Sequence, residues 1–346
     1  MAQLKPSNTT FAKIKVVGVG GGGSNAVDSM ITAQKIQNVE FVAVNTDAQA
    51  LLRSQSSSKL QIGSNFTKGL GSGGDPLIGE AAAQESKDKI RDVLHGTELV
   101  FLTAGMGGGT GTGASPVIAK IAQELGALVV AVVTKPFEFE GSQRMTQAEE
   151  GIDFLIPNVD AHIVVPNQKL VEILDDQITL LNAFKYADRV LGQGVQGISD
   201  LITIPGMINA DFADVKNIMT NCGSLLMGLG EASGEDRATK AATQAVTSPL
   251  LELTIEGAQG LIFNITAGSS VKLSEITAAA KIISERADKK ANIIFGHTVD
   301  DTLSDKIKIT VIATGFRSRT RLRSVPFKAT NTKRLEIPTY LRMATT

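Results

Sequence analysis

The chain has 346 residues, 34 of them Lys or Arg and 35 Asp or Glu, with a net charge of −1, so its overall charge gives no attraction to nucleic acid or to a membrane surface. A single cysteine, Cys222, excludes an intramolecular disulfide and is typical of a reducing compartment. No apolar run approaches the roughly 20 residues of a membrane span, and residues 1–10 lack the apolar stretch of a secretory signal. We therefore expect a soluble, intracellular protein of about two domains.

Short apolar segments alternate with helical patterns after a flexible tail at residues 1–12. The apolar segments are rich in Val, Ile and Ala on both faces, which is typical of a sheet covered by helices. The expected strands are residues 14–19, 40–45, 99–103, 128–134 and 161–165. The βα succession predicts an α/β fold in which residues 13–173 form a doubly wound parallel sheet.

One long helix is expected over residues 174–203, where apolar side chains recur every three to four positions. Its three glycines, Gly192, Gly194 and Gly197, each cost roughly 1 kcal/mol relative to Ala. Close packing against neighbouring backbone would offset that cost, so we expect the helix to be buried between two domains.

A second, smaller α+β domain is expected over residues 204–316. Its predicted strands are residues 225–230, 260–267, 291–298 and 306–314, and its predicted helices are residues 236–247 and 273–287. Residues 317–335 are rich in Arg, Lys, Ser and Thr and are interpreted as a basic linker. The linker is either simply solvated or in contact with anionic lipid or nucleic acid.

Three glycine-rich loops lie within the first 113 residues. The strongest, residues 105–113, has six glycines in nine residues between a predicted strand and a predicted helix. Glycines let backbone N–H groups approach an anion, threonine hydroxyls add donors, and the helix N-terminus adds partial positive charge. With the loops at residues 18–25 and 69–75, this pattern predicts a triphosphate surrounded by backbone amides.

The first glycine loop also allows a different interpretation. Residues 18–23 match G-x-G-x-x-G, and Asp47 stands near the position of a ribose-binding acid, as in a nicotinamide-dependent oxidoreductase. That alternative assigns no function to residues 107–113 or to residues 209–214. A P-loop NTPase is excluded because its G-x-x-x-x-G-K-[ST] motif does not occur.

Two aspartates, Asp211 and Asp214, stand before an apolar helical run and by themselves are candidates for helix N-capping. The long helix separates them from the phosphate loops. Two carboxylates there could polarise a water only for a nucleotide held by a neighbouring molecule.

The glycine run at residues 107–113, residues 133–137 and 139–141, Arg144 and residues 209–214 together resemble the FtsZ family of bacterial tubulin homologues, which are cell-division GTPases. The resemblance covers roughly residues 14–316 and the end of the chain. It implies the tubulin/FtsZ fold, assembly-dependent GTP hydrolysis and head-to-tail filaments that form the division ring. Mg²⁺ is expected on the β- and γ-phosphates, with no protein ligands assigned.

The resemblance also implies roles for particular residues. The GTP-binding candidates are Gly21, Gly22, Gly23, Ser24 and Asn25 in the first loop, Gly108, Gly109, Thr110, Gly111 and Thr112 in the signature loop, Glu140 and Arg144 near the ribose and phosphates, and Asn167, Phe184 and Asp188 at the base. Asp75 stands where the family pattern leads us to expect asparagine.

The base site can also be argued physically, because Phe184 and Asp188 lie four apart on one predicted helix and share a face. A purine on the ring would present its edge to the carboxylate. Guanine offers two donors there and adenine an acceptor, which favours GTP over ATP. The alternative is that Phe184 belongs to the core and Asp188 to a solvated face.

By the same resemblance, Asn209, Asp211 and Asp214 are the catalytic synergy loop, which enters the nucleotide pocket of the next subunit and helps to position the attacking water. Hydrolysis should then require assembly. A GTP-binding polymer with weak hydrolysis and a plastid-division paralogue are the alternatives.

The terminal cluster, residues 336–346, resembles the family's tail peptide, although a frayed terminus is the alternative. Pro338 suits a first helical position, and Ile337, Tyr340 and Leu341 stand at i, i+3 and i+4. The implied partners are membrane-tethering and regulatory division proteins rather than a specific nucleic acid. The expected location is the cytoplasm at the mid-cell division site, or the plastid stroma if a transit peptide has been removed.

Overall fold

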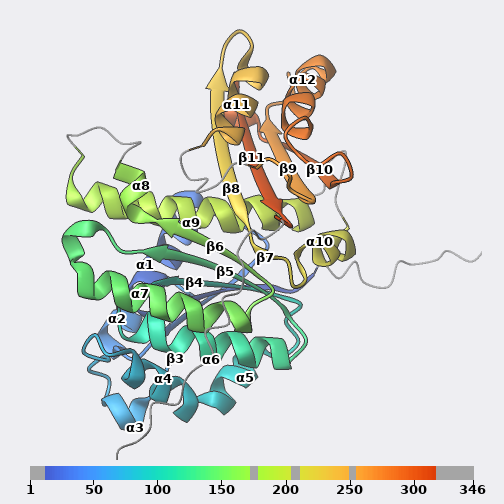
Figure 1. The fold of residues 1–346 in the computed structure, drawn as a ribbon. Helices are drawn as coiled ribbons and strands as arrows, with labels where there is room; N and C mark the ends of the chain where they lie inside the picture. The colour runs from blue at the N-terminus through green and yellow to red at the C-terminus, as the bar shows by residue number, and fades with distance from the viewer. Residues whose placement is uncertain (1–11, 172–177, 204–210, 249–254, 317–346) are drawn as a thin grey trace, which may run out of the picture. The chain divides into compact units, whose positions relative to one another are not determined.

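The computed structural model describes residues 12–171, 178–203, 211–248 and 255–316. In this part of the chain, two sheets lie on either side of one long helix (Figure 1). None of the helices described there is long and apolar enough to cross a membrane. The expected α/β fold with a smaller second domain is confirmed.

The first sheet has seven strands in the order β3-β2-β1-β4-β5-β6-β7, and all neighbouring strands are parallel. Its strands are β1 (Ile14–Val19), β2 (Glu40–Asn45), β3 (Ser58–Gln61), β4 (Leu99–Gly105), β5 (Leu128–Lys135), β6 (Ala161–Pro166) and β7 (Gly223–Ser224). The five strands expected from their apolar runs are confirmed. The two strands that were not expected are the edges of the sheet, where β3 is partly exposed and β7 is two residues long.

Helices cover both faces of this sheet, as its apolar strands require. One face carries α4 (Pro76–Glu85), α5 (Lys87–Leu94), α6 (Thr110–Glu124) and α7 (Ser142–Leu155). The other carries α1 (Gly20–Ser29), the π-helical turn η1 (Met30–Gln34), α8 (Asn167–Val171) and α9 (Leu180–Thr203). Shorter connecting elements are α2 (Ala48–Arg53), α3 (Ser64–Thr67), η2 (Glu138–Glu140) and η3 (Ile156–Asn158).

The long helix is confirmed as α9, although its expected start is wrong. Among the described residues it begins at Leu180, because Ile178 and Thr179 are not helical and the Thr179 hydroxyl accepts a hydrogen bond from the backbone N–H of Asn182 at 3.3 Å. A side-chain oxygen that accepts from the first turn ends the helical pattern on its N-terminal side. Residues 174–177 of the expected helix lie outside the described part.

The glycines of α9 do allow close packing, but against side chains rather than against backbone. A Cβ on Gly194 would stand 3.3 Å from Val132 of β5 and 3.4 Å from the sulfur of Met227, and a Cβ on Gly197 would stand 2.7 Å from Thr310. These neighbours come from both sheets. The helix is thus buried between the two domains as expected.

The second sheet is mixed, in the order β10-β9-β11-β8, with β11 antiparallel to both of its neighbours. Its strands are β8 (Leu226–Ser233), β9 (Gly260–Ala267), β10 (Asn292–Val299) and β11 (Lys306–Thr314). The associated helices are α10 (Phe212–Met219), α11 (Arg237–Val246), α12 (Leu273–Ser284) and the short η4 (Asp301–Leu303). All four expected strands and both expected helices are present, with ends shifted by up to three residues.

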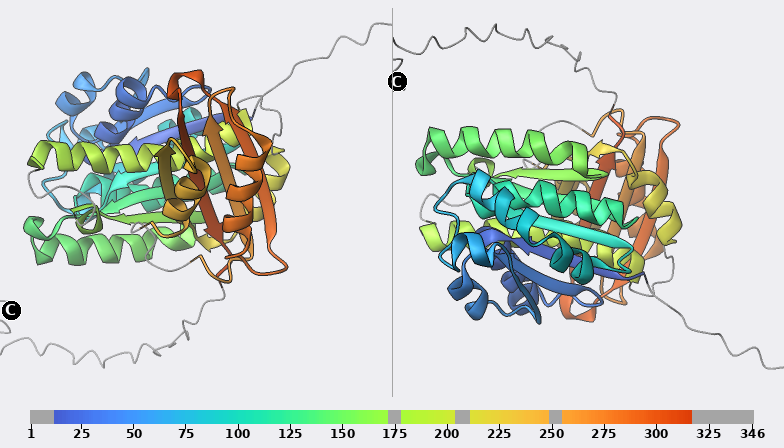
Figure 2. Two further views of the ribbon diagram at one scale, coloured as in Figure 1. Left: turned by 90° about the horizontal axis from the view of Figure 1, so that it is seen from above. Right: turned by 90° about the horizontal axis from the view of Figure 1, so that it is seen from below.

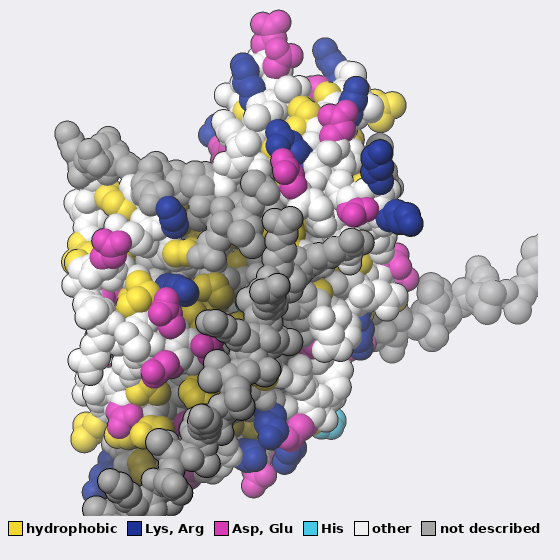
Figure 3. Space-filling model, in the orientation of Figure 1, with side chains coloured by type: hydrophobic (Ala, Val, Ile, Leu, Met, Phe, Trp, Pro, Cys, Tyr) yellow, Lys and Arg dark blue, Asp and Glu magenta, His cyan; other side chains and the backbone are white. Residues whose placement is uncertain are grey.

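One hydrophobic core is shared by the two sheets. It contains Val132 of β5, Val195 and Ile198 of α9, and Ile262 and Ile312 of the second sheet, each no more than 1% exposed. The second sheet lies over the C-terminal part of α9, whose N-terminal part extends beyond it (Figures 1 and 2). On the visible surface of the described residues, acidic and basic side chains are interspersed (Figure 3).

Candidate functional site

A cavity of about 890 Å³ opens where the carboxyl ends of the parallel strands meet. Loops after β1, β2, β4, β5 and β6 all contribute to its lining, together with the N-terminal part of α9. Loops at this edge of a doubly wound sheet form its usual ligand site. The three glycine-rich loops, at residues 18–25, 69–75 and 105–113, all reach this one cavity.

Two helices begin at the cavity, and neither has a side-chain cap. Helix α1 begins at Gly20 and α6 at Thr110, and no side chain caps either N-terminus. Their first backbone N–H groups are therefore open to an anion. Gly20 has φ +73°, and a Cβ there would stand 2.8 Å from the backbone nitrogen of Gly111. The two loops are in contact at a position where only glycine fits.

Hydroxyl groups join the third glycine loop to the signature loop. Thr110 Oγ1 lies 2.6 Å from Thr46 Oγ1 and 3.0 Å from Ser72 Oγ. All three side chains line the cavity and are at most 7% exposed. A Cβ on Gly109 would collide with Ser72 Oγ and would stand 2.8 Å from the backbone of Asp75.

At the other end of the cavity, Phe184 and Asp188 lie one turn apart on α9, and both line it. The Phe184 ring meets the buried Phe137 edge to face, with centroids 5.2 Å apart, and it is itself 38% exposed. Burial raises the pKa of the Asp188 carboxyl to about 7. Nearby, the buried Asn167 Oδ1 has no hydrogen-bond partner among the described residues. An aromatic face and polar groups without partners are suited to a planar, polar ligand.

Glu140 and Arg144 form an ion pair at the cavity wall. Arg144 Nη1 lies 3.0 Å from Glu140 Oε2, and Glu140 Oε1 accepts a hydrogen bond from the backbone N–H of Phe137 at 2.9 Å. The carboxylate is nearly buried while the guanidinium is half exposed. The guanidinium therefore keeps donors available to the cavity.

Most of the predicted GTP-binding residues meet in this cavity. Its lining includes Gly21, Gly22, Asn25, Gly108, Gly109, Thr110, Gly111, Glu140, Arg144, Asn167, Phe184 and Asp188. Gly23, Ser24 and Thr112 do not line it and are buried behind it, where the Thr112 hydroxyl accepts a hydrogen bond from the Gly107 N–H at 2.9 Å. The predicted GTP-binding roles of all these residues, lining or not, stay predictions.

Sequence reasoning missed several lining residues, among them Thr46, Gln143 and Gln147. Ser72 also lines the cavity; it lies in the third glycine loop, which was expected near the phosphates, but was not named as a candidate by itself. Gln147 Nε2 donates to the backbone oxygen of Gly74 at 2.8 Å and so holds the third glycine loop to α7. Thr46 follows directly after β2, so the convergence of loops at the carboxyl ends of parallel strands was the signal available for it.

Three of the aspartates singled out in the sequence, Asp47, Asp75 and Asp211, cap helices. Asp47 accepts hydrogen bonds from the N–H groups at the start of α2, Asp75 from Leu77 N at 2.9 Å, and Asp211 from Ala213 N at 3.3 Å. Capping accounts for an aspartate at position 75 without any contact to a ligand. Asp211 and Asp214 are exposed, while Asn209 and the tail residues Ile337, Pro338, Tyr340 and Leu341 lie outside the described part of the chain.

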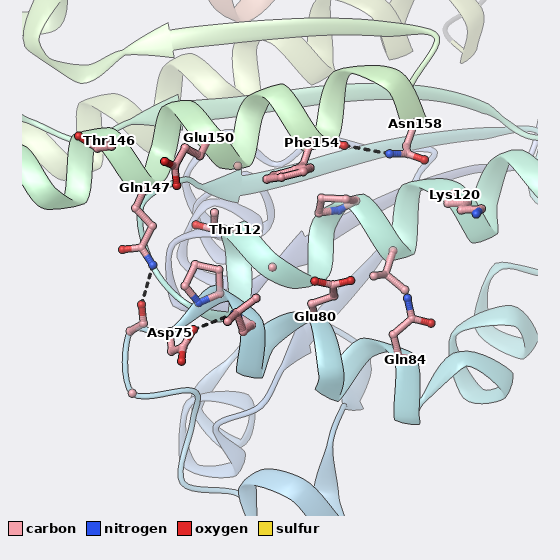
Figure 4. Close-up of a pocket in the computed structure, with 18 of the residues that line it drawn as sticks. Asp75, Glu80, Gln84, Thr112, Lys120, Thr146, Gln147, Glu150, Phe154 and Asn158 are labelled. Atoms are coloured by element: carbon pink, nitrogen blue, oxygen red, sulfur yellow. Dashed lines mark hydrogen bonds between the residues drawn. The ribbon is translucent and has the colours of Figure 1, made fainter. Parts of the chain in front are cut away.

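A larger groove, of about 1120 Å³, lies between α4, α6 and α7 (Figure 4). Glu80 and Gln84 of α4, Lys120 of α6, and Glu150 and Phe154 of α7 point into it. It shares only four lining residues with the cavity, Gly73, Gly74, Gln143 and Gln147. Helix side chains rather than strand-end loops form it, so the groove does not stand at the usual ligand site of a doubly wound sheet, whereas the cavity does.

Comparison with known proteins agrees with this geometry. The model of the tubulin/FtsZ family GTPase domain matches residues 13–175, and that of the FtsZ family C-terminal domain matches residues 223–317. An empty FtsZ dimer from M. jannaschii is 44% identical over 91% of this chain and 91% of that chain, with a TM-score of 0.86. The chain belongs to the tubulin/FtsZ family.

Membership of the tubulin/FtsZ family makes the chain a GTPase that binds GTP and GDP, and the oxidoreductase alternative is wrong. A point mutant of FtsZ from the same organism is also 44% identical, over 90% of this chain and 93% of that chain, with a TM-score of 0.85. A GDP-bound CetZ1 monomer from Haloferax volcanii is 21% identical over 88% and 95% of the two chains, with a TM-score of 0.74, and shares the fold.

Proposed function

We propose that the protein is a GTPase that polymerises head to tail, and that each active site is completed by residues 209–214 of the adjacent subunit. One observation carries this proposal: the exposed Asp211 and Asp214 follow the C-terminal end of α9, while Phe184 and Asp188 lie near its N-terminal end. A helix of 24 residues is about 36 Å long. Helix α10, at whose start these acidic groups stand, lies by the C-terminal end of α9 (Figure 1), whereas the N-terminal part of α9 lines the cavity. This separation supports a head-to-tail contact.

Within the cavity, the glycine loops hold the triphosphate by backbone N–H groups, and Asp188 accepts from the guanine edge above Phe184. The carboxylates of the next subunit orient a water for in-line attack on the γ-phosphorus. The bond to the β–γ bridging oxygen breaks, releasing GDP and phosphate. Positioning supplies most of the rate enhancement in such a reaction.

Mg²⁺ is expected to neutralise the β- and γ-phosphates. No cluster of three or more His, Cys, Asp or Glu side chains that could hold a metal occurs among the described residues. The phosphates and water molecules would then supply most of the metal's ligands, as is common for Mg²⁺.

Complementation between two inactive variants tests the shared site. Asp214→Ala keeps the cavity but lacks a catalytic carboxylate, and Asp188→Ala keeps the acidic loop but lacks the base contact. At a GTP concentration well below the dissociation constant of Asp188→Ala, neither variant should hydrolyse GTP at an appreciable rate alone. In an equimolar copolymer about one interface in four joins an intact cavity to an intact loop, so about a quarter of wild-type turnover should return.

The matched controls are turnover across a range of wild-type concentrations and sedimentation of the mixed polymer. We expect the rate per molecule to rise above a threshold concentration together with light scattering. A rate that does not change with concentration, or a mixture that assembles without regaining activity, would assign the complete site to a single chain.

A role in division rests on family membership. We propose that the filaments form a ring at the division site and that Ile337, Pro338, Tyr340 and Leu341 bind a membrane-tethering partner. Removing residues 336–346 should leave GTP turnover unchanged and abolish the ring in a complemented cell. If cells with the truncated protein still formed the ring, residues 336–346 would not be needed for it and the proposed role of the tail would be refuted.

A further inference from the structure

The inference concerns the buried hydroxyls beside the signature loop, and it rests on the proposed function. We propose that Thr46 and Ser72 are positioning residues that make the Thr110 hydroxyl a hydrogen-bond donor to the terminal phosphate of GTP. Thr46 comes from the end of β2, Ser72 from the third glycine loop and Thr110 from the start of α6. Three segments far apart in the sequence thus meet at one oxygen atom.

The distances define the contacts available to that oxygen. Thr110 Oγ1 lies 2.6 Å from Thr46 Oγ1 and 3.0 Å from Ser72 Oγ, both within hydrogen-bonding distance. Thr46 is fully buried, and Ser72 and Thr110 are each 7% exposed. Bulk water is therefore a poor substitute for either neighbour.

Either partner can donate in each of the two bonds, and counting hydrogens shows which direction leaves Thr110 free to donate to a ligand. A hydroxyl donates one hydrogen bond and accepts two. If Thr46 and Ser72 both donate, they fill the two lone pairs of Thr110 Oγ1 and leave its single hydrogen free for the cavity. An anionic phosphate oxygen selects this arrangement, and bonds in a chain strengthen one another.

Removing one neighbour makes Thr110 a weaker donor. Without the Ser72 hydroxyl, one lone pair of Thr110 Oγ1 loses its hydrogen bond, and because hydrogen bonds in a chain strengthen one another, the bond from Thr110 to the phosphate weakens. The hydroxyl pair should therefore favour a nucleotide whose terminal phosphate reaches Thr110. We infer that it contributes to the discrimination of GTP from GDP.

The test measures the dissociation constants of fluorescent GTP and GDP analogues for the full chain, below the concentration at which it assembles. Thr46→Val and Ser72→Ala each remove one hydroxyl with little change in shape, and each should weaken GTP about fivefold more than GDP. Thr46→Ser keeps the hydroxyl and should restore the wild-type ratio. Ser115→Ala is the matched control, because it removes a buried hydroxyl of α6 that bonds the backbone oxygen of Gly111 and does not line the cavity.

Two outcomes would overturn the inference. One is an equal loss of GTP and GDP affinity in Thr46→Val and Ser72→Ala, which a purely structural role of the network would give. The other is a Thr46→Ser variant that behaves as Thr46→Val does. A wild-type chain that binds neither nucleotide would instead refute the proposed function itself.

Discussion

Nucleotide affinity should depend on pH through Asp188. Burial raises the pKa of this carboxyl to about 7 in the free protein, whereas its ordinary value is near 4. Guanine needs the ionised form, because its N1–H and exocyclic amine both donate. Protonated Asp188 must lose its proton before it can accept both hydrogen bonds.

The magnitude follows from the ionised fraction. With a pKa of about 7, roughly nine-tenths of the free protein is ionised at pH 8 and roughly one-tenth at pH 6, so GTP should bind about tenfold more weakly at pH 6. Asp188→Asn should lose about 2 kcal/mol, or roughly 30-fold in affinity, at pH 8 because a neutral amide replaces charge-assisted acceptors.

The assay is equilibrium binding of fluorescent GTP between pH 6 and pH 8, with wild type and Asp188→Asn side by side. The phosphates of the ligand also titrate in this range, and the variant corrects for them because it binds the same ligand. Between pH 8 and pH 6, the affinity of the wild type for GTP should fall about tenfold more than that of Asp188→Asn. Parallel pH profiles for the two proteins would refute the assignment of the guanine edge to Asp188.

Three further changes separate local roles. Gly109→Ala should abolish nucleotide binding because its Cβ would collide with Ser72 Oγ of the third glycine loop; an unchanged affinity in this variant would contradict the steric argument. Burial raises the pKa of Asp200 to about 7, so the native state retains a proton that the unfolded state has lost, and stability falls as pH rises from about 4 to about 7. Asp200→Asn should remove this loss of stability, which is up to about 4 kcal/mol in the free energy of unfolding measured by denaturant titration. If the pH dependence of that free energy were the same in the variant, the assignment to Asp200 would be refuted. Arg237→Met removes a buried guanidinium that donates to the partly exposed Glu275 and the exposed Asp305. It should destabilise the protein by about 2 kcal/mol in the same titrations because charge-assisted hydrogen bonds are lost. Lys306→Met at an exposed pair should change the stability little, and similar losses in the two variants would show that burial of the arginine is not the cause.

Most of the fold could be predicted because its strands are buried on both faces. β1, β2 and β9 begin and end where their apolar runs do. The edge strand β3 could not be found this way, since its four residues are mostly partly exposed and include a lysine. The start of α9 was predicted too early because periodicity alone does not show that Thr179 caps the helix.

The phosphate side of the site could be predicted because the loops there contact one another so closely that glycine is required, and a loop rich in glycine is easily recognised in a sequence. The supporting hydroxyls could not, since Thr46 and Ser72 are ordinary residue types whose role depends on a partner 64 and 38 residues away. The sequence left open whether Asp211 caps a helix, and in the structure Asp211 does accept a hydrogen bond from the first turn of α10. Asp214 lies in that first turn and is not the capping residue.

The core shared through α9 has a thermodynamic consequence. Side chains of both sheets pack on the same helix, so neither sheet can open without exposing apolar surface of the other, and the two should unfold in one cooperative transition. Ligand binding then stabilises everything that unfolds with the site. Amide hydrogens of β9 and β11, which are remote from the cavity, should exchange more slowly when the nucleotide is bound.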